Sequence, residues 1–100
     1  MEREQEILEW IKRGMDRYSD DLGDDKIYLF GSRARRDHRE RSDFDLGVYG
    51  EKPISLHTFY EISDYLEDLP TLYRIEWVDL NRAAPEFRKD ALKNAVKIHG

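Results

Sequence analysis

Residues 43 to 50, DFDLGVYG, alternate strictly between two kinds of side chain. The odd positions begin with Asp43 and Asp45, while the even positions carry Phe44, Leu46 and Val48. Because successive side chains of a β-strand point to opposite faces, the pattern predicts a strand with one apolar and one acidic face. The apolar face belongs to a core, so the chain has to build a sheet that buries one side of this strand.

The segments around this strand predict the other elements. Apolar residues at helical spacing predict helices over residues 2–18, 55–69 and 85–100, with Ser55 as an N-terminal cap. Runs rich in β-branched and aromatic residues predict strands over 26–30 and 71–80, and a short helix is expected after Gly31. The fold class expected is α/β (α+β), in the order α-β-α-β-α-β-α. We expect a small mixed β-sheet of about three strands, with the helices largely on one face.

Length and charge limit the class of protein. One hundred residues with 39% hydrophobic content fit a single domain, 1–100, which is too small to add a full substrate domain, so a partner is expected. A net charge of −5 argues against a protein that mainly grips a nucleic acid backbone. The absence of cysteine excludes disulfides, and no apolar run approaches the roughly 20 residues of a spanning helix. A soluble, cytoplasmic protein without membrane contact is the expectation.

The segment from residue 31 to 48 carries the residues suited to chemistry. Gly31 and Ser32 end a strand and open a short helix, an arrangement that offers backbone N–H groups and a hydroxyl to phosphate. Asp43 and Asp45 project from one strand face, and paired carboxylates suit Mg²⁺ or Mn²⁺. A third acid on a neighbouring strand could complete a two-metal site. Asp79 is predicted to supply it, with Glu76 on the opposite strand face.

At these residues the sequence resembles the nucleotidyltransferase superfamily that includes DNA polymerase beta and kanamycin nucleotidyltransferase. Its signature is Gly-Ser, a spacer and then Asp-x-Asp on a strand. GSRAR, SDFDL and the later VDL further resemble the minimal nucleotidyltransferases, including the antitoxins of HEPN/MNT toxin–antitoxin pairs. The element order matches over residues 5 to 98. The family commonly has glycine where this chain has Arg36, and a left-handed arginine there would cost about 1 kcal/mol relative to glycine.

The resemblance implies roles for particular residues. Catalysis and the binding of two Mg²⁺ ions would rest on Asp43, Asp45 and Asp79, with Asp79 also as general base. The nucleotide-binding residues would be Gly31, Ser32, Arg33, Arg35 and Ser42, with Arg33 and Arg35 as phosphate-side or structural charges.

Three functions remain open at this point. The first, implied by the resemblance, is transfer of AMP from ATP to a tyrosine of an all-α, HEPN-type ribonuclease toxin, with the chain as the antitoxin of a hetero-oligomer. The second is modification of a small molecule together with a separate substrate-binding subunit. The third is a non-catalytic antitoxin that binds its partner by contact. The Gly-Ser turn and the set of three acids favour the first two, because three converging carboxylates are unfavourable without a metal.

Overall fold

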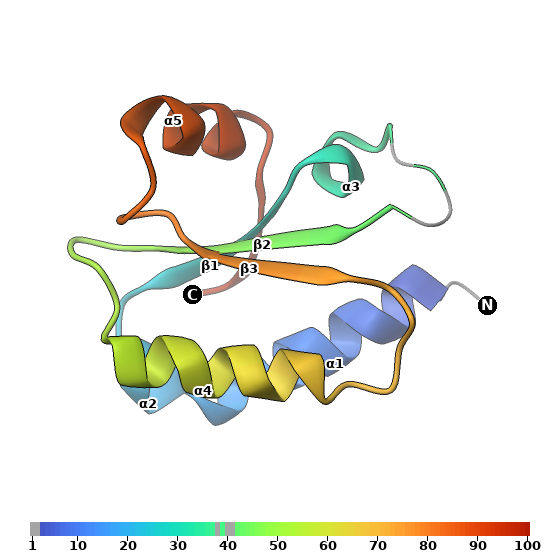
Figure 1. The fold of residues 1–100 in the computed structure, drawn as a ribbon, viewed down its shortest axis with the longest axis horizontal. Helices are drawn as coiled ribbons and strands as arrows, with labels where there is room; N and C mark the ends of the chain where they lie inside the picture. The colour runs from blue at the N-terminus through green and yellow to red at the C-terminus, as the bar shows by residue number, and fades with distance from the viewer. Residues whose placement is uncertain (1–2, 38, 40–41) are drawn as a thin grey trace.

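The computed structural model describes residues 3–37, 39 and 42–100. Helices and strands alternate along most of this length (Figure 1). The helices are α1 (Arg3–Arg17), α2 (Ser19–Leu22), α3 (Ser32–Arg35), α4 (Leu56–Glu67) and α5 (Pro85–Lys93). The strands are β1 (Lys26–Phe30), β2 (Phe44–Tyr49), β3 (Ile75–Asp79) and β4 (Val96–His99). None of the helices in the described residues is long and apolar enough to cross a membrane.

The strands form one mixed sheet in the order β3-β2-β1-β4. β1 pairs antiparallel with both β2 and β4, whereas β2 and β3 run parallel and are joined through α4. Asp45, near the start of β2, lies between Phe30 at the end of β1 and Glu76 near the start of β3 in the strand register. This part of β2 is therefore flanked by a strand on each side.

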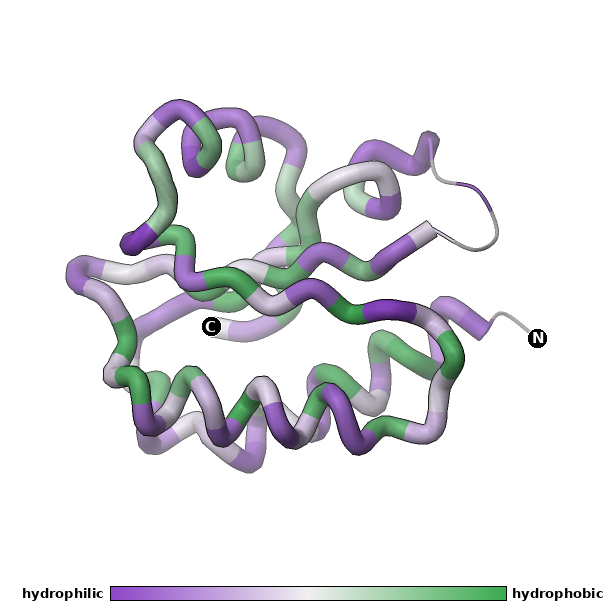
Figure 2. The backbone as a smooth tube through the Cα atoms, viewed as in Figure 1, coloured by the Kyte–Doolittle hydropathy of each residue, from purple (hydrophilic) through white to green (hydrophobic). Residues whose placement is uncertain are grey.

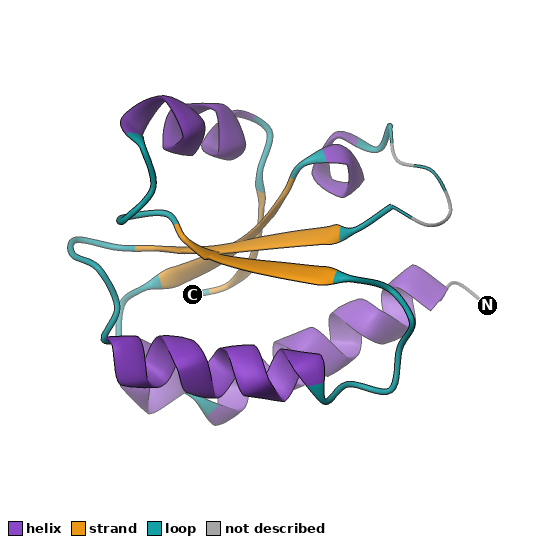
Figure 3. Ribbon diagram, in the orientation of Figure 1, coloured by secondary structure: helices purple, strands orange, loops and turns teal. Residues whose placement is uncertain are grey.

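One face of the sheet carries the main core. The helices α1, α2 and α4 cover this face, while α3 and α5 lie on the other side (Figures 1 and 3). The even positions of β2 are buried here, as the alternation predicts. The core consists of Ile7, Ile11, Met15, Leu22, Ile27, Leu29, Phe44, Leu46, Val48, Ile54, Ile62 and Leu66.

The opposite face is only partly covered. A smaller cluster of Phe30, Leu80 and Ala91 packs under α5. Gly47 belongs to this face, and a side chain there would collide with Leu80, which explains the glycine in mid-strand. The described chain directly after α3 is hydrophilic (Figure 2). Charged residues on this side of β2 are thus left near the surface beside a small apolar cluster.

The α/β class and most elements predicted from sequence are confirmed, including the Ser55 cap, whose hydroxyl accepts a hydrogen bond from the Thr58 N–H. Three details were wrong. The sheet has four strands, not about three, because the predicted helix over 85–100 ends at Lys93 and Val96–His99 pairs with β1. The helices occupy both faces, since α5 covers Phe30 and Leu80. The short α2 before β1 was missing from the predicted order.

Candidate active site

Asp43 and Asp45 lie on the partly covered face of the sheet, where the strand alternation predicts them. Asp43 directly precedes β2 and is exposed, whereas Asp45 is half-buried within the strand. Phe44, between them, is fully buried on the opposite face. The two carboxylates therefore share one face, as a cation site on this strand requires.

Gly31 brings the end of β1 against this pair of acids. Its backbone has φ 73°, in the region that favours glycine. A Cβ at this position would collide with Oδ2 of Asp45, so close approach also requires glycine. The Ala34 and Arg35 N–H groups bond to the Gly31 carbonyl and close the turn that Ser32 opens into α3. The Gly-Ser turn and the acids thus form one site.

The electrostatics of Asp45 are unfavourable for an anion. Burial raises the pKa of this carboxyl, and the charges of Asp43 and then Glu76 raise it further, with Arg35 acting in the opposite direction. In the described part of the chain, no hydrogen-bond donor is bonded to the side chain of Asp43 or Asp45. Oxygen ligands with concentrated negative charge are suited to a hard divalent cation.

The third acid of this face is Glu76, and the prediction that Asp79 shares the face of Asp45 was wrong. Parallel pairing sets Glu76 beside Asp45 and Asp79 beside Val48. Residues paired in register point to the same side, so Asp79 lies with the core side of β2 and Glu76 with the acids. The sequence shows that Glu76 and Asp79 point to opposite faces of β3. It does not show which of these faces lies on the Asp45 side of the sheet.

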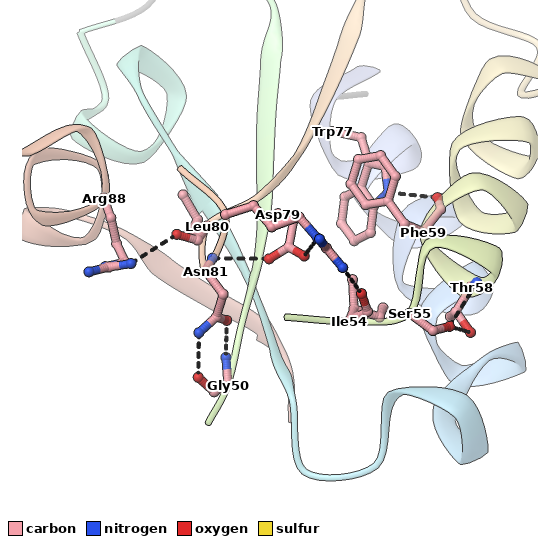
Figure 4. Close-up of polar contacts among 11 residues, drawn as sticks. Gly50, Ile54, Ser55, Thr58, Phe59, Trp77, Asp79, Leu80, Asn81 and Arg88 are labelled. Atoms are coloured by element: carbon pink, nitrogen blue, oxygen red, sulfur yellow. Dashed lines mark hydrogen bonds and ion pairs between the residues drawn. The ribbon is translucent and has the colours of Figure 1, made fainter. Parts of the chain in front are cut away.

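Asp79 has a different environment, at the end of β3 (Figure 4). Its side chain is 5% exposed, and its Oδ1 accepts from the Asn81 N–H at 3.0 Å while Oδ2 accepts from Arg82 Nε at 3.1 Å. Arg82 also donates to the Ile54 carbonyl at 3.0 Å, and the Asn81 side chain bonds both backbone polar groups of Gly50. Asp79 therefore orients Asn81 and Arg82, whose side chains bond the chain after β3 to the connection between β2 and α4.

Arg33 is buried and fully engaged in contacts within the fold. Its side chain is 3% exposed, and its guanidinium lies 4.1 Å from the Phe44 ring centroid on the core side. It pairs with Glu4 at 2.7 Å and donates to the Ser42 carbonyl at 3.0 Å. Of the two roles predicted for Arg33, this position favours the structural one over phosphate binding.

Arg35 and Ser42, both predicted to bind the nucleotide, have different surroundings. Arg35 is exposed, forms an ion pair with Asp37 at 3.1 Å and lies close enough to Asp45 to affect its pKa. The Ser42 hydroxyl accepts from the Arg39 N–H at 2.8 Å, a contact just before β2. Arg36 adopts the left-handed conformation, φ 65°, that the glycine common at this place in the family would favour.

The acids do not form a closed metal cage as they stand. Among residues 3–37, 39 and 42–100, no group of three His, Asp or Glu side chains is arranged to hold a metal ion. The carboxylate of Glu76, beside Asp45 in the strand register, is paired with Arg74 at 2.9 Å. The chemistry of these donors nevertheless fits a divalent cation. Asp43 and Asp45 share one face, Glu76 lies beside Asp45 in the strand register, and the pKa of Asp45 is raised.

A family model described as "Polymerase beta, Nucleotidyltransferase" matches residues 23–100. The match covers β1 to β4, including the Gly-Ser turn and both strand acids. The chain belongs to this nucleotidyltransferase family. The resemblance carried by residues 31 to 48 is thereby confirmed.

Known relatives and solved structures agree with this membership. A Methanocaldococcus jannaschii protein, MJ1217, whose name proposes that it is a protein adenylyltransferase, is 44% identical over 43 residues. This match spans 43% of the chain and 44% of the relative, so the chain matches less than half of that protein's length.

Two solved structures share the fold of this nucleotidyltransferase domain. One is a crystal structure of a toxin–antitoxin complex with AMP-PNP, with a TM-score of 0.65 at 20% identity, covering 89% of this chain and 73% of that one. The other is a protein proposed to be a minimal nucleotidyltransferase, with a TM-score of 0.57 at 27% identity, covering 91% and 92%. The first likeness concerns the fold alone.

Proposed function

We propose that this nucleotidyltransferase domain transfers AMP from ATP to an acceptor hydroxyl, with Asp43, Asp45 and Glu76 holding two Mg²⁺ ions. The observation that carries the proposal is the environment of Asp45. This carboxyl is half-buried beside two other acids and has a raised pKa, an arrangement that folding does not favour on its own. Bound Mg²⁺ would supply charge for the triphosphate and for the developing negative charge of the transition state.

Glu76 replaces Asp79 as the proposed third ligand and proton acceptor. It shares the Asp45 face, whereas the Asp79 carboxylate is already bonded to Arg82 and Asn81. The Arg74–Glu76 pair is exposed, with side chains 72% and 41% accessible, and such pairs contribute only about 0–1 kcal/mol. Glu76 can therefore turn from Arg74 toward a cation at little cost.

The triphosphate is proposed to lie along the Gly-Ser turn. Gly31 admits close backbone approach, Ser32 offers a hydroxyl, and Arg35 supplies positive charge beside the acids. In the reaction, the acceptor oxygen attacks the α-phosphorus, the bond to the bridging oxygen breaks and pyrophosphate leaves. The hydroxyl proton passes to the Glu76 carboxylate.

We propose a tyrosine of a helical, HEPN-type toxin as the acceptor, which gives this chain the role of an antitoxin. Three findings support this part of the proposal: the toxin–antitoxin assembly among the fold neighbours, the AMP-PNP in that structure, and the adenylyltransferase name of the M. jannaschii relative. Neither of the two hollows of about 760 and 820 Å³ in the described chain is lined by Gly31, Asp45 or Glu76, which is consistent with an acceptor brought by another chain.

Intact-mass spectrometry tests this function. The chain is mixed with a helical, HEPN-type protein, if one is encoded beside its gene, together with ATP and Mg²⁺. An added AMP on a partner tyrosine that requires Asp43, Asp45 and Glu76 is the expected result. A tight complex without any mass shift, formed equally well by the Asp43→Ala, Asp45→Ala variant, would support a non-catalytic antitoxin instead.

A further inference from the structure

A hollow of about 200 Å³ lies between α3 and α5, next to the proposed phosphate site. Gly31 and Arg35 line one side, and Phe30 lines the sheet end. Because Gly31 also touches the Asp45 carboxylate, the hollow opens beside the acids. It is smaller than the roughly 300–1,000 Å³ of pockets that hold whole ligands, so it suits one part of a larger molecule.

One face of α5 forms the other wall of this hollow. Phe87, Asp90 and Asn94 line it and follow one another at helical spacings of three and four residues. Phe87 is 47% exposed, although its ring packs edge-on against Phe30 at 6.0 Å. Asp90 and Asn94 are exposed, and neither side chain has a hydrogen-bond or ion-pair partner within the described residues. The wall therefore combines an aromatic ring with unengaged polar groups.

We propose that this hollow binds the nucleobase of the triphosphate, and that it selects a base with an exocyclic amino group, such as adenine. The proposal rests on the proposed function, because it takes Asp45 as the point where the phosphates are held. The exposed Phe87 ring offers a surface for stacking, which tightens binding by about 5- to 150-fold per base.

The side chains of Asp90 and Asn94 are the groups proposed to select a base with an exocyclic amino group. The Asn94 amide offers a donor and an acceptor together, the combination that pairs with the amino group and ring nitrogen of adenine. The Asp90 carboxylate is an acceptor only and requires an N–H donor. Arg35, on the facing wall, is the positive group that lies toward the phosphates and Asp45.

NMR titration of the full ¹⁵N-labelled chain tests the site by comparing Mg·ATP with Mg·tripolyphosphate, which lacks the base. We expect the wild type to bind ATP about tenfold more tightly than tripolyphosphate. Phe87→Ala and Asn94→Ala should reduce this ratio toward one, and tripolyphosphate binding should not change. Lys89→Ala, on α5 but away from the hollow, is the matched control and should leave the ratio as in the wild type.

Asp90→Asn distinguishes recognition of the base by Asp90 from electrostatic repulsion between Asp90 and the phosphates. Removing a negative charge beside a polyanion should strengthen the binding of both ligands if only electrostatics act. The proposal instead predicts weaker ATP binding and a lower ratio. This substitution and Asn94→Ala change exposed side chains, so they remain informative if Phe87→Ala lowers stability.

Each outcome decides between the proposals. Equal binding of ATP and tripolyphosphate by the wild type, or an unchanged ratio in the three variants, would overturn the base site and leave the phosphate site standing. Failure of the wild type to bind either ligand with Mg²⁺ would overturn both the proposed function and the base site.

Discussion

Asp45 and Asp79 are two acids on neighbouring strands of one sheet, and their surroundings are opposite. Asp79 is almost fully buried, and its two oxygens accept from Asn81 and Arg82. Asp45 is half-buried, faces Asp43 and Glu76 and has a raised pKa. A buried polar group with satisfied hydrogen bonds stabilises a fold, whereas clustered like charges need an outside partner. The comparison separates a structural acid from the acid of the proposed active site.

The largest effect should come from Asp45→Asn or Asp43→Asn. We expect the loss of a metal ligand to reduce nucleotide transfer by on the order of 100-fold or more, with the fold intact. Transfer of AMP in the presence of Mg²⁺, followed by mass spectrometry, measures this, and circular dichroism checks the fold. Transfer at the wild-type rate by the Asp45→Asn variant would show that Asp45 has no role in catalysis. The proposed functional difference between Asp45 and Asp79 would then be wrong.

Glu76→Gln tests the reassigned third acid and should lower transfer by about 10- to 100-fold. The neutral amide keeps the size of the side chain and removes its charge. Arg74→Gln is the matched control, because it frees Glu76 from its exposed ion pair and should leave transfer at or above the wild-type rate. If Glu76→Gln is fully active while Asp79→Asn is inactive, the original assignment of Asp79 is restored.

Asp79→Asn should act on stability, with transfer by the folded protein retained. We expect a loss of about 1–3 kcal/mol in the free energy of unfolding, because the neutral side chain weakens the bond from Arg82 at a site that is 5% exposed. Urea unfolding measures this. Arg82→Gln should give a loss of the same sign, and a stabilised Asp79→Asn variant would show that its carboxylate is as unfavourably placed as that of Asp45.

The smallest effect concerns pH. The folded-state pKa of Asp45 is raised, so ionisation destabilises the folded chain, and stability falls as pH rises from the ordinary value of 3.8 through the raised pKa. Asp45→Asn should therefore be more stable than the wild type at neutral pH, and the difference should vanish below that ordinary value. Asp25 also has a raised pKa, caused mainly by burial, and the comparison with the variant cancels its contribution. Thermal melts across pH that show no such convergence would contradict the account.

The alternation in residues 43 to 50 was enough to predict the strand, its buried face and the acids on the other face. These features depend on neighbours in sequence, as does the Ser55 cap. The Gly-Ser turn was equally visible, because its close approach to Asp45 needs the small residue that the sequence shows.

The features that were missed depend on partners far apart in the chain. The parity that joins Glu76 to Asp45 is set by the register of β3 against β2, which no local pattern specifies. Residues 96–99 continue a helical spacing of apolar residues and become a strand only because β1 offers a free edge. The sequence left the role of Arg33 open between phosphate binding and structure, because its contacts with Glu4 and Phe44 come from other elements.

Paramagnetic broadening by Mn²⁺ tests the central claim most directly. Trace Mn²⁺ added with ATP to the ¹⁵N-labelled chain broadens the amide signals nearest the bound ion. The account predicts that the signals of Gly31, Asp45 and Glu76 disappear first, while those of Asn81 and Arg82 persist. Early loss of the Asn81 and Arg82 signals, with Gly31 and Asp45 unaffected, would place the metal at Asp79 and contradict the account.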